Sequence, residues 1–381
     1  MLHEMPQTPR VQPIAQEEFM TLHVVKTGIG WMRAHLWVAL SAGLAAGFMA
    51  GAASAATPSA GSAAIQKATK AVDTASIVAN GATTKNWPAY GLEYSSGRFS
   101  KLDQINAGNV DKLGLAWTFD LGSTHHGVEA TPIVVDGVMY VTVPWNIVYA
   151  LDARTGKQIW SYDPKVPRGT AVKACCDVTN RGVAVYQGRV YEGTLDGRLI
   201  ALDAATGKLD WSVNALPAGE HNGTITGAPL AADGKVVIGY GGAEYFGTRG
   251  SVAAFDAKTG KMDWRWYTVP GDPAKGYEDA ALKRAAKTWD PKTMYWLKGG
   301  GATVWQSFSY DPKLDLVYFG TGNADPWNRM ARGGPAFHSL YASSIVALDL
   351  KTGKYAWSYQ TTPADFSDYD SDQDMTLATL K

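Results

Sequence analysis

The chain has 381 residues, of which 46% are hydrophobic and 18% charged, and its 35 basic and 35 acidic side chains give a formal net charge of zero. This balance excludes the basic surface of a nucleic-acid-binding protein. The hydrophobic share is too high for a disordered chain and too interrupted for a protein with many membrane spans. Gly contributes 41 residues and Trp 14, which indicates a globular protein built from strands and turns.

Residues 1–55 resemble an export signal with a long n-region. Leu36–Ala55 is uncharged and rich in alanine, and it ends in a small-x-small sequence that suits signal peptidase. We therefore expect cleavage after Ala55 and a periplasmic mature protein with no membrane span. The alternative is a retained N-terminal anchor, because the stretch is long enough to cross a bilayer. Met20 and Met32 are alternative starts, and residues 56–85 are predicted to be a flexible lead-in.

A repeated segment determines the predicted architecture. It consists of an apolar strand ending in Asp, a Thr-Gly-Lys turn and a Trp, and its copies end at Trp160, Trp211, Trp264 and Trp357, with a degenerate copy ending at Trp117. The spacings are 43, 51, 53 and 93 residues, and periods of ~40–50 residues are typical of propeller blades. Each Trp is expected to pack one blade against its neighbour.

The fold class predicted is therefore all-β, a propeller over residues 86–381 with about four to five blades. The long last spacing contains a segment without strand pattern, where we expect a short helical insertion near 274–290. The last Trp unit lies close to Lys381, so the propeller is expected to be incomplete in this chain.

The two cysteines, Cys175 and Cys176, are neighbours. Adjacent Cα atoms lie ~3.8 Å apart, below the usual disulfide range, so a bond between them closes a strained ring. Two free thiols are the alternative. An oxidising compartment favours the vicinal disulfide, and strain of this kind is typical of functional sites.

Several oxygen-bearing side chains are candidate ligands of a hard cation such as Ca²⁺. Glu244 and Asn323 each follow a predicted strand, and Asp365, Asp368 and Asp370 lie in an acidic run near the C-terminus. Each of them taken alone also fits a solvated loop residue. No zinc-type spacing, Gly-x-Ser-x-Gly sequence or phosphate-binding loop is present, which argues against zinc, esterase and nucleotide chemistry.

Taken together, the motifs resemble one family. The Trp-ended repeats are joined by Cys175-Cys176 before Asn180-Arg181-Gly182, by Ile225-Thr226-Gly227, by Gly242-Ala243-Glu244, and by Gly322-Asn323 before Pro326-Trp327-Asn328. In this order they resemble the pyrroloquinoline-quinone (PQQ) alcohol dehydrogenases of the methanol and ethanol dehydrogenase type, and most of all the quinohaemoprotein alcohol dehydrogenases. The resemblance extends from about Asn86 to Lys381 and implies the N-terminal part of an eight-bladed propeller.

The resemblance also implies the roles of individual residues. The Cys175–Cys176 ring would cover one face of PQQ and Trp305 would stack on the other. The residues expected to hold the carboxylates and quinone oxygens of PQQ are Glu129, Arg181, Thr226, Gly242, Ala243 and Thr303. Glu244, Asn323 and Asp368 would surround a metal ion that acts as a Lewis acid, and Asp368 would take the alcohol proton.

This sequence departs from the family pattern in three places. The family's Asp-x-Trp-Asp is Asp365-Phe366-Ser367-Asp368 here, which leaves Asp365 as an alternative base. Asp370 stands where an acidic residue accompanies lanthanide rather than calcium use; it would then be a further metal ligand, or else a solvated carboxylate. The family's later blades, with a further basic residue that contacts PQQ and any haem-binding Cys-x-x-Cys-His, are not in this chain.

The predicted function is the periplasmic oxidation of a primary alcohol or aldehyde with PQQ and Ca²⁺ or a lanthanide, and a c-type cytochrome as electron acceptor. Haem c is expected only in a part beyond this chain, and the chain alone is not expected to complete turnover. The alternative is a non-enzymatic propeller scaffold of the outer-membrane assembly type, which shares the Trp repeat but should lack the cysteine pair and the Gly-Ala-Glu segment. A truncated relic that binds nothing is a third alternative.

Overall fold

The computed structural model describes residues 61–122, 127–242 and 247–380. The chain divides into two units, Met1–Ala56 and Thr57–Lys381, and all the described residues belong to the second. The expected signal, with its alternative as a membrane anchor, lies outside them. Within the described ranges, no helix is long and apolar enough to cross a membrane.

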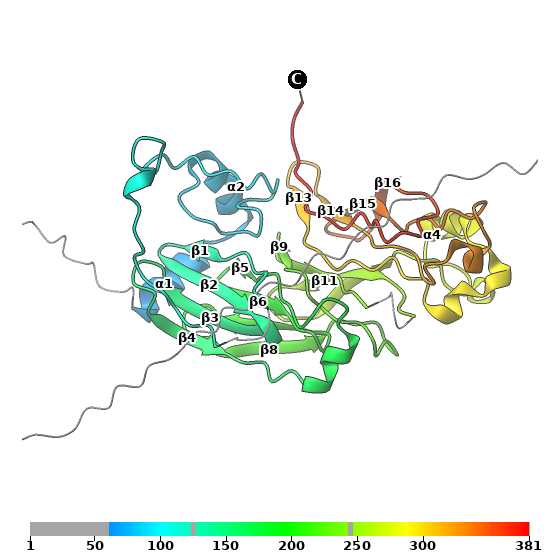
Figure 1. Cartoon of the computed structure of the whole chain (residues 1–381), viewed down its shortest axis with the longest axis horizontal. Coiled ribbons are helices and arrows are strands. Elements are labelled where there is room, and N and C mark those ends of the chain that lie inside the picture. The colour runs from blue at the N-terminus through cyan, green and yellow to red at the C-terminus, as the bar shows by residue number, and fades with distance from the viewer. Residues whose placement is uncertain (1–60, 123–126, 243–246, 381) are drawn as a thin grey trace, which may run out of the picture. The chain divides into compact units, whose positions relative to one another are not determined.

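The described residues form four sheets, each made of four antiparallel strands that pair in chain order. Figure 1 shows these sheets following one another along the chain. Blade 1 contains β1 (Ile133–Val135), β2 (Val138–Val143), β3 (Ile147–Asp152) and β4 (Gln158–Tyr162), and blade 2 contains β5 (Ala184–Tyr186), β6 (Arg189–Gly193), β7 (Arg198–Asp203) and β8 (Leu209–Asn214). Blade 3 contains β9 (Leu230–Ala232), β10 (Lys235–Ile238), β11 (Ser251–Asp256) and β12 (Met262–Tyr267), and blade 4 contains β13 (Ser309–Asp311), β14 (Leu316–Gly320), β15 (Ser344–Asp349) and β16 (Tyr355–Gln360).

The repeated Asp-x-x-Thr-Gly-Lys turn joins the third and fourth strands of each blade. In blade 2, Asp203 Oδ1 accepts hydrogen bonds from the Thr206 N–H at 2.9 Å and the Thr206 hydroxyl at 2.8 Å. The Gly207 N–H donates to the Asp203 carbonyl at 2.8 Å, and Gly207 has a φ of +70°, which favours glycine. The register shifts between Ala201 and Leu202, just before the turn, and a matching shift occurs in the other three blades. The four turns are therefore one structure repeated.

Tryptophan packs neighbouring blades together, as the repeat predicts. Trp160 of blade 1 lies on the turn of blade 2, so that a Cβ on Gly207 would lie 2.6 Å from the indole Cε3, and its Nε1–H donates to the Ala204 carbonyl at 3.0 Å. The same close approach joins three further pairs, which are Trp117 with Gly156, Trp211 with Gly260, and Trp264 with Gly353. The segment around Trp117 is not a strand, but its indole contacts blade 1 as each blade's Trp contacts the next blade.

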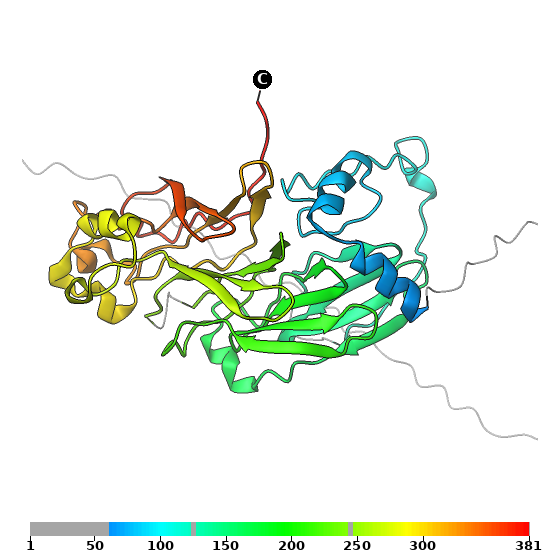
Figure 2. The ribbon, with the colours of Figure 1, turned by 180° about the vertical axis from the view of Figure 1, so that it is seen from behind.

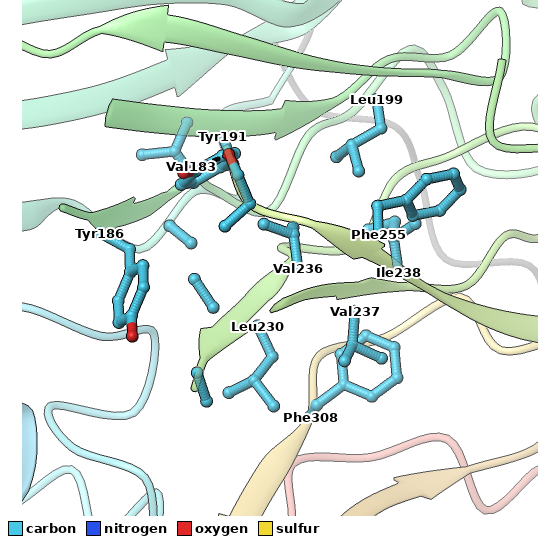
Figure 3. Close-up of a cluster of buried hydrophobic side chains, with 14 of the residues drawn as sticks. Val183, Tyr186, Tyr191, Leu199, Leu230, Val236, Val237, Ile238, Phe255 and Phe308 are labelled. Carbon is cyan, nitrogen blue, oxygen red and sulfur yellow. Dashed lines mark hydrogen bonds between the residues drawn. The ribbon is translucent and has the colours of Figure 1, made fainter. Parts of the chain in front are cut away.

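Between the sheets, apolar side chains form one continuous core. Figure 3 shows Tyr191 and Leu199 of blade 2 close to Val236 and Phe255 of blade 3, with Phe308 next to Val237. Both faces of β7 and β11 are buried, and their sequences are therefore nearly continuous apolar runs. The predicted propeller-type, all-β fold is confirmed.

The helices of the described residues are short. The expected insertion contains α4 (Ala280–Ala285), and Asp279 caps its N-terminus by accepting a hydrogen bond from the Leu282 N–H at 2.7 Å. The 3₁₀ helices are η1 (Val110–Lys112), η2 (Pro144–Asn146), η3 (Arg168–Lys173), η4 (Pro273–Lys275), η5 (Ala286–Thr288), η6 (Pro291–Thr293), η7 (Tyr295–Lys298) and η8 (Arg329–Arg332).

The expected flexible lead-in at residues 56–85 differs from the structure. It contains α1 (Ser62–Lys70) and α2 (Thr74–Thr83), and α1 lies against blade 2 (Figure 2). Ile65 and Ile77 are buried, and the Gly188 N–H at the β5–β6 turn donates to the carbonyl of the α1 residue Thr69 at 2.9 Å. The polar, alanine-rich composition suggested a linker, whereas a few well-spaced apolar residues are enough to dock these helices.

Candidate functional site

A cavity of about 360 Å³ is lined by the segments that lead into blades 2, 3 and 4, by the connections that follow β10 and β14, and by the chain after β16. Its volume is within the range of ~300–1,000 Å³ that is usual for small-molecule sites. Its walls come from Cys175, Cys176, Thr179, Arg181, Thr224, Thr226, Gly241, Gly242, Trp305, Trp327, Asp368, Tyr369, Asp370 and Gln373. Segments far apart in the sequence therefore build one site.

The cysteine pair forms one wall of the cavity. Cys175 and Cys176 are joined in a vicinal disulfide, with Cα atoms 3.8 Å apart, and both are exposed. The loop that carries them follows η3 and precedes β5. The predicted disulfide is therefore confirmed against the alternative of two free thiols.

Arg181 places a positive charge at the cavity. Its guanidinium forms an ion pair with Glu129 at 3.1 Å and donates to the Thr226 hydroxyl at 2.7 Å. The same guanidinium lies 5.1 Å from the centre of the Trp305 ring, within the range of a cation–π contact. Glu129 thus reaches the site through Arg181 and is not among the side chains that line the cavity. An arginine held in this way suits a carboxylate-bearing ligand.

Trp305 is held at several points. Its backbone N–H donates to Asp372 Oδ2 at 2.6 Å, and its indole Nε1–H donates to Asp370 Oδ2 at 3.1 Å. Gly227 lets the neighbouring backbone approach closely, because a Cβ there would lie 2.6 Å from the Trp305 carbonyl oxygen. The indole is only partly buried and lines the cavity. It therefore presents a fixed flat surface to whatever occupies the site.

Buried oxygen atoms without a hydrogen-bond partner among the described residues include Thr179 Oγ1 on the cavity wall, and Asn323 Oδ1 and Thr303 Oγ1 behind it. Leaving such a group unsatisfied costs ~1–3 kcal/mol, so a native site usually supplies a ligand, an ion or water there. The Asn323 backbone N–H donates to Asp370 Oδ1, which fixes Asn323 close to the cavity wall. An amide oxygen is a suitable ligand for a hard cation.

Asp368 lies on the cavity wall and has a φ of +58°. Burial, and secondarily the neighbouring Asp365, raises the pKa of the Asp368 carboxyl above its ordinary value. Asp365 itself is buried, and its carboxylate accepts from the Ser367 N–H at 2.9 Å, the Tyr369 N–H at 3.1 Å and the Ser343 hydroxyl at 2.9 Å. Asp365 is thus occupied in holding the loop, whereas Asp368 faces the cavity.

Arg332 connects this loop with the segment that carries Asn323. Its guanidinium is buried and donates to the Ala324 carbonyl at 3.1 Å and to the Asp365 carbonyl. Burial lowers the pKa of Arg332 to about 10. Arg332 therefore holds together, by hydrogen bonds, the two loops that bring Asn323 and Asp368 to the site.

Most of the candidate residues come together. Those that line the cavity are Cys175, Cys176, Arg181, Thr226, Gly242, Trp305, Asp368 and Asp370. Thr303, Asn323 and Glu129 lie behind this lining. Ala243 and Glu244 lie outside the described residues, and within the described part no group of three or more His, Cys, Asp or Glu side chains converges on a point that could hold a metal ion.

Sequence reasoning missed several members of the site. Thr179, Thr224, Tyr369 and Gln373 also line the cavity. Each of them lies within a few residues of a predicted site residue, so their position next to the motifs was the sequence feature that could have identified them. Asp372 was missed because it stands in an acidic run that reads as solvated, yet it is fully buried.

These sheets are the blades of a β-propeller, and their connecting segments build a pocket from a disulfide ring, an indole, an arginine and carboxylates. The sequence profile of the PQQ glucose/ethanol/alcohol dehydrogenase β-propeller domain matches residues 87–381. The chain belongs to this PQQ-dependent family.

Named relatives agree with this assignment. The chain is 52% identical over 353 residues to the quinohemoprotein alcohol dehydrogenase of Comamonas testosteroni, covering 92% of this chain and 48% of that protein. It is 46% identical over 318 residues to the 1-butanol dehydrogenase (cytochrome c) of Thauera butanivorans, covering 81% and 44%. The chain thus spans about half the length of the curated relatives it matches.

Solved structures give the same result for the fold. The crystal structure of the Comamonas testosteroni quinohemoprotein alcohol dehydrogenase superposes with a TM-score of 0.82 at 54% identity, over 84% of this chain and 48% of that one. A europium-containing methanol dehydrogenase superposes with a TM-score of 0.73 at 38% identity, over 80% and 54%.

Proposed function

We propose that the chain supplies PQQ- and metal-binding blades of a periplasmic dehydrogenase that oxidises a primary alcohol. The observation that carries the proposal is the cavity in which the vicinal disulfide, Trp305, Arg181 and Asp368 all face the same space. The names of the relatives, which include a quinohemoprotein alcohol dehydrogenase and an alcohol dehydrogenase (quinone), support the same reaction class.

The fit of PQQ rests on shape and charge. PQQ is flat and carries carboxylates, so it needs flat apolar surfaces and cationic or hydrogen-bonding groups at its edge. In the proposal, the Cys175–Cys176 ring and the Trp305 indole cover its two faces, while Arg181 binds a carboxylate. The remaining contacts are assigned to Glu129, Thr226, Gly242, Ala243 and Thr303. Thr303 Oγ1, which lacks a hydrogen-bond partner in the described part of the chain, supports this assignment, because a ligand would satisfy it.

The metal ion is assigned to Asn323, Asp368, Asp370 and Glu244. The buried Asn323 Oδ1 has no hydrogen-bond partner among the described residues, and a cation would satisfy it. Carboxylate and amide oxygens are hard ligands, which favours Ca²⁺ or a lanthanide over a transition metal.

When bound, PQQ would supply a two-electron acceptor for the hydride of the alcohol carbon, and the cation would supply Lewis-acid polarisation. The protein's own contribution is the removal of the hydroxyl proton by the Asp368 carboxylate. A raised pKa makes a carboxylate a stronger base, which suits this role. Tyr369 and Trp327 at the cavity wall would contact the alcohol.

A c-type cytochrome is the proposed electron acceptor, as the name of the Thauera butanivorans relative indicates for that protein. Haem c would belong to a part of the protein beyond this chain. The predicted export signal and the vicinal disulfide support a periplasmic location.

A single-turnover experiment tests the reaction. The chain is saturated with PQQ and Ca²⁺ or La³⁺ and mixed with ethanol, and the reduction of bound PQQ is followed by absorbance. We expect Asp368→Asn to slow the reduction by at least about 100-fold, in line with the ~10²–10⁴ contribution of a general base, while the exposed-loop control Asp103→Asn keeps the wild-type rate. A wild-type chain whose bound PQQ is not reduced by any primary alcohol would contradict the proposal.

A further inference from the structure

Two carboxylates converge on Trp305 from one short segment. Asp370 Oδ2 accepts the indole Nε1–H at 3.1 Å, and Asp372 Oδ2 accepts the backbone N–H at 2.6 Å. We infer that Asp370 and Asp372 are positioning residues that together fix both the backbone and the ring of Trp305. This inference rests on the proposed function in one respect, because the fixed ring matters only if it covers PQQ.

The position of Asp372 is enforced by its surroundings. The Ser371 N–H donates to the Thr321 carbonyl at 3.1 Å, which attaches the segment to the chain just after β14. A Cβ on Gly320 would collide with the Ser371 carbonyl oxygen, so the two backbones are as close as glycine allows. Asp372 therefore cannot move away from Trp305 without displacing the end of blade 4.

The Asp372 carboxylate interacts with the backbone N–H groups of Trp305 and of the next residue, Gln306. The side chain is fully buried, and its Oδ1 has no hydrogen-bond partner among the described residues. Burying a carboxyl group is costly unless donors satisfy it, and the donor that lies 2.6 Å from Asp372 Oδ2 is the Trp305 backbone N–H. An apolar side chain would fill the same space at lower cost, but it would leave the Trp305 N–H without an acceptor.

Asp370 acts on the other end of the same residue. Its Oδ1 accepts the Asn323 N–H while its Oδ2 accepts the indole. One carboxylate thus links the backbone of Asn323, whose side chain is assigned to the metal, with the ring assigned to the cofactor.

The test asks whether Asp372 acts on Trp305 as a hydrogen-bond acceptor or through its negative charge. Trp305 is observed by ¹⁹F NMR in the full chain labelled with 5-fluorotryptophan, and Trp305→Phe assigns its resonance. Asp372→Leu removes the acceptor, whereas Asp372→Asn keeps a carbonyl oxygen that can accept the Trp305 N–H. Val346→Ala, a buried substitution in β15, is the control for a general loss of stability in blade 4.

We expect Asp372→Leu to shift or broaden the Trp305 resonance and to weaken PQQ binding, measured by equilibrium dialysis, by about tenfold, the equivalent of one buried hydrogen bond. The Trp305 resonance of Asp372→Asn should match that of the wild type, and Val346→Ala should leave it unchanged. If Asp372→Leu does not fold, Asp370→Asn takes its place, because its single carbonyl oxygen cannot serve both Asn323 and the indole, and the resonance should shift.

A wild-type Trp305 resonance in folded Asp372→Leu, or in Asp370→Asn where the Leu variant does not fold, would overturn the inference. Equal shifts in Asp372→Leu and Asp372→Asn would overturn it too, since charge and not the acceptor would then matter. The NMR readout does not need PQQ. A wild-type chain that fails to bind PQQ would therefore contradict the proposed function, while the shift in Asp372→Leu would still report on the positioning of Trp305.

Discussion

The contact between tryptophan and the glycine turn can be tested by adding one methyl group. In Gly207→Ala, the new Cβ would lie 2.6 Å from Trp160 Cε3 and 2.7 Å from Cδ2. Carbon atoms pack best at ~3.5–4.0 Å, so the indole or the turn must move by about 1 Å. Gly234→Ala is a matched control, because Gly234 also has a positive φ, +76°, but a Cβ there would have no atom within 4 Å.

The two substitutions share one cost and differ in another. Both place alanine in the left-handed region, which costs ~1–2 kcal/mol. Only Gly207→Ala adds overpacking, which typically costs ~1–3 kcal/mol. We therefore expect Gly207→Ala to lower the free energy of unfolding by about 2–5 kcal/mol and Gly234→Ala by about 1–2 kcal/mol.

Urea denaturation followed by circular dichroism measures both variants. Combining Gly207→Ala with Trp160→Ala should reduce the cost of the glycine substitution to that of Gly234→Ala, since the obstructing ring is gone. Equal losses for the two single glycine variants would refute the reasoning, and so would an undiminished cost in the double variant.

Two other predictions concern buried and covalent groups. Burial raises the pKa of Glu192 well above its ordinary value of 4.5, so folding favours the protonated form and the fold loses stability as pH rises above that value. Glu192→Gln should therefore match the stability of the wild type at about pH 4 and become the more stable protein towards pH 8. A stability difference in urea denaturation that does not change with pH would contradict this. Reduction of Cys175–Cys176 should change the melting temperature by less than about 2 °C, since a bond between neighbours constrains almost no loop in the unfolded chain, but it should weaken PQQ binding measured by dialysis; unfolding on reduction would show that the ring is structural instead.

The architecture could be predicted because each blade contains a copy of the same sequence repeat. Trp160 and Gly207 belong to successive copies of one short motif, and their contact recurs at every blade junction that the structure describes. The Asp-Thr-Gly turn is local, so the hydrogen bonds of Asp203 follow from neighbouring residues. Helix α1 was missed because it has no repeat and its docking depends on isolated residues such as Ile65.

The site was only partly predictable, for a different reason. The cysteine pair and Trp305 could be identified from motifs, but their partners depend on chain segments that meet only in the folded protein. Asp372 lies 67 residues from Trp305, and no local pattern reveals that its carboxylate accepts the Trp305 N–H. An acidic residue in an acidic run is usually solvated, and only its burial distinguishes Asp372.

The central claim is that these blades bind PQQ with a metal ion, and the most direct measurement is a PQQ titration of the chain with and without Ca²⁺ or La³⁺. We expect metal-dependent quenching of tryptophan fluorescence and a raised melting temperature. Asn323→Ala should remove the dependence on metal, while Asp103→Asn should retain it. A folded wild-type chain that shows neither quenching nor stabilisation with either metal would contradict the claim.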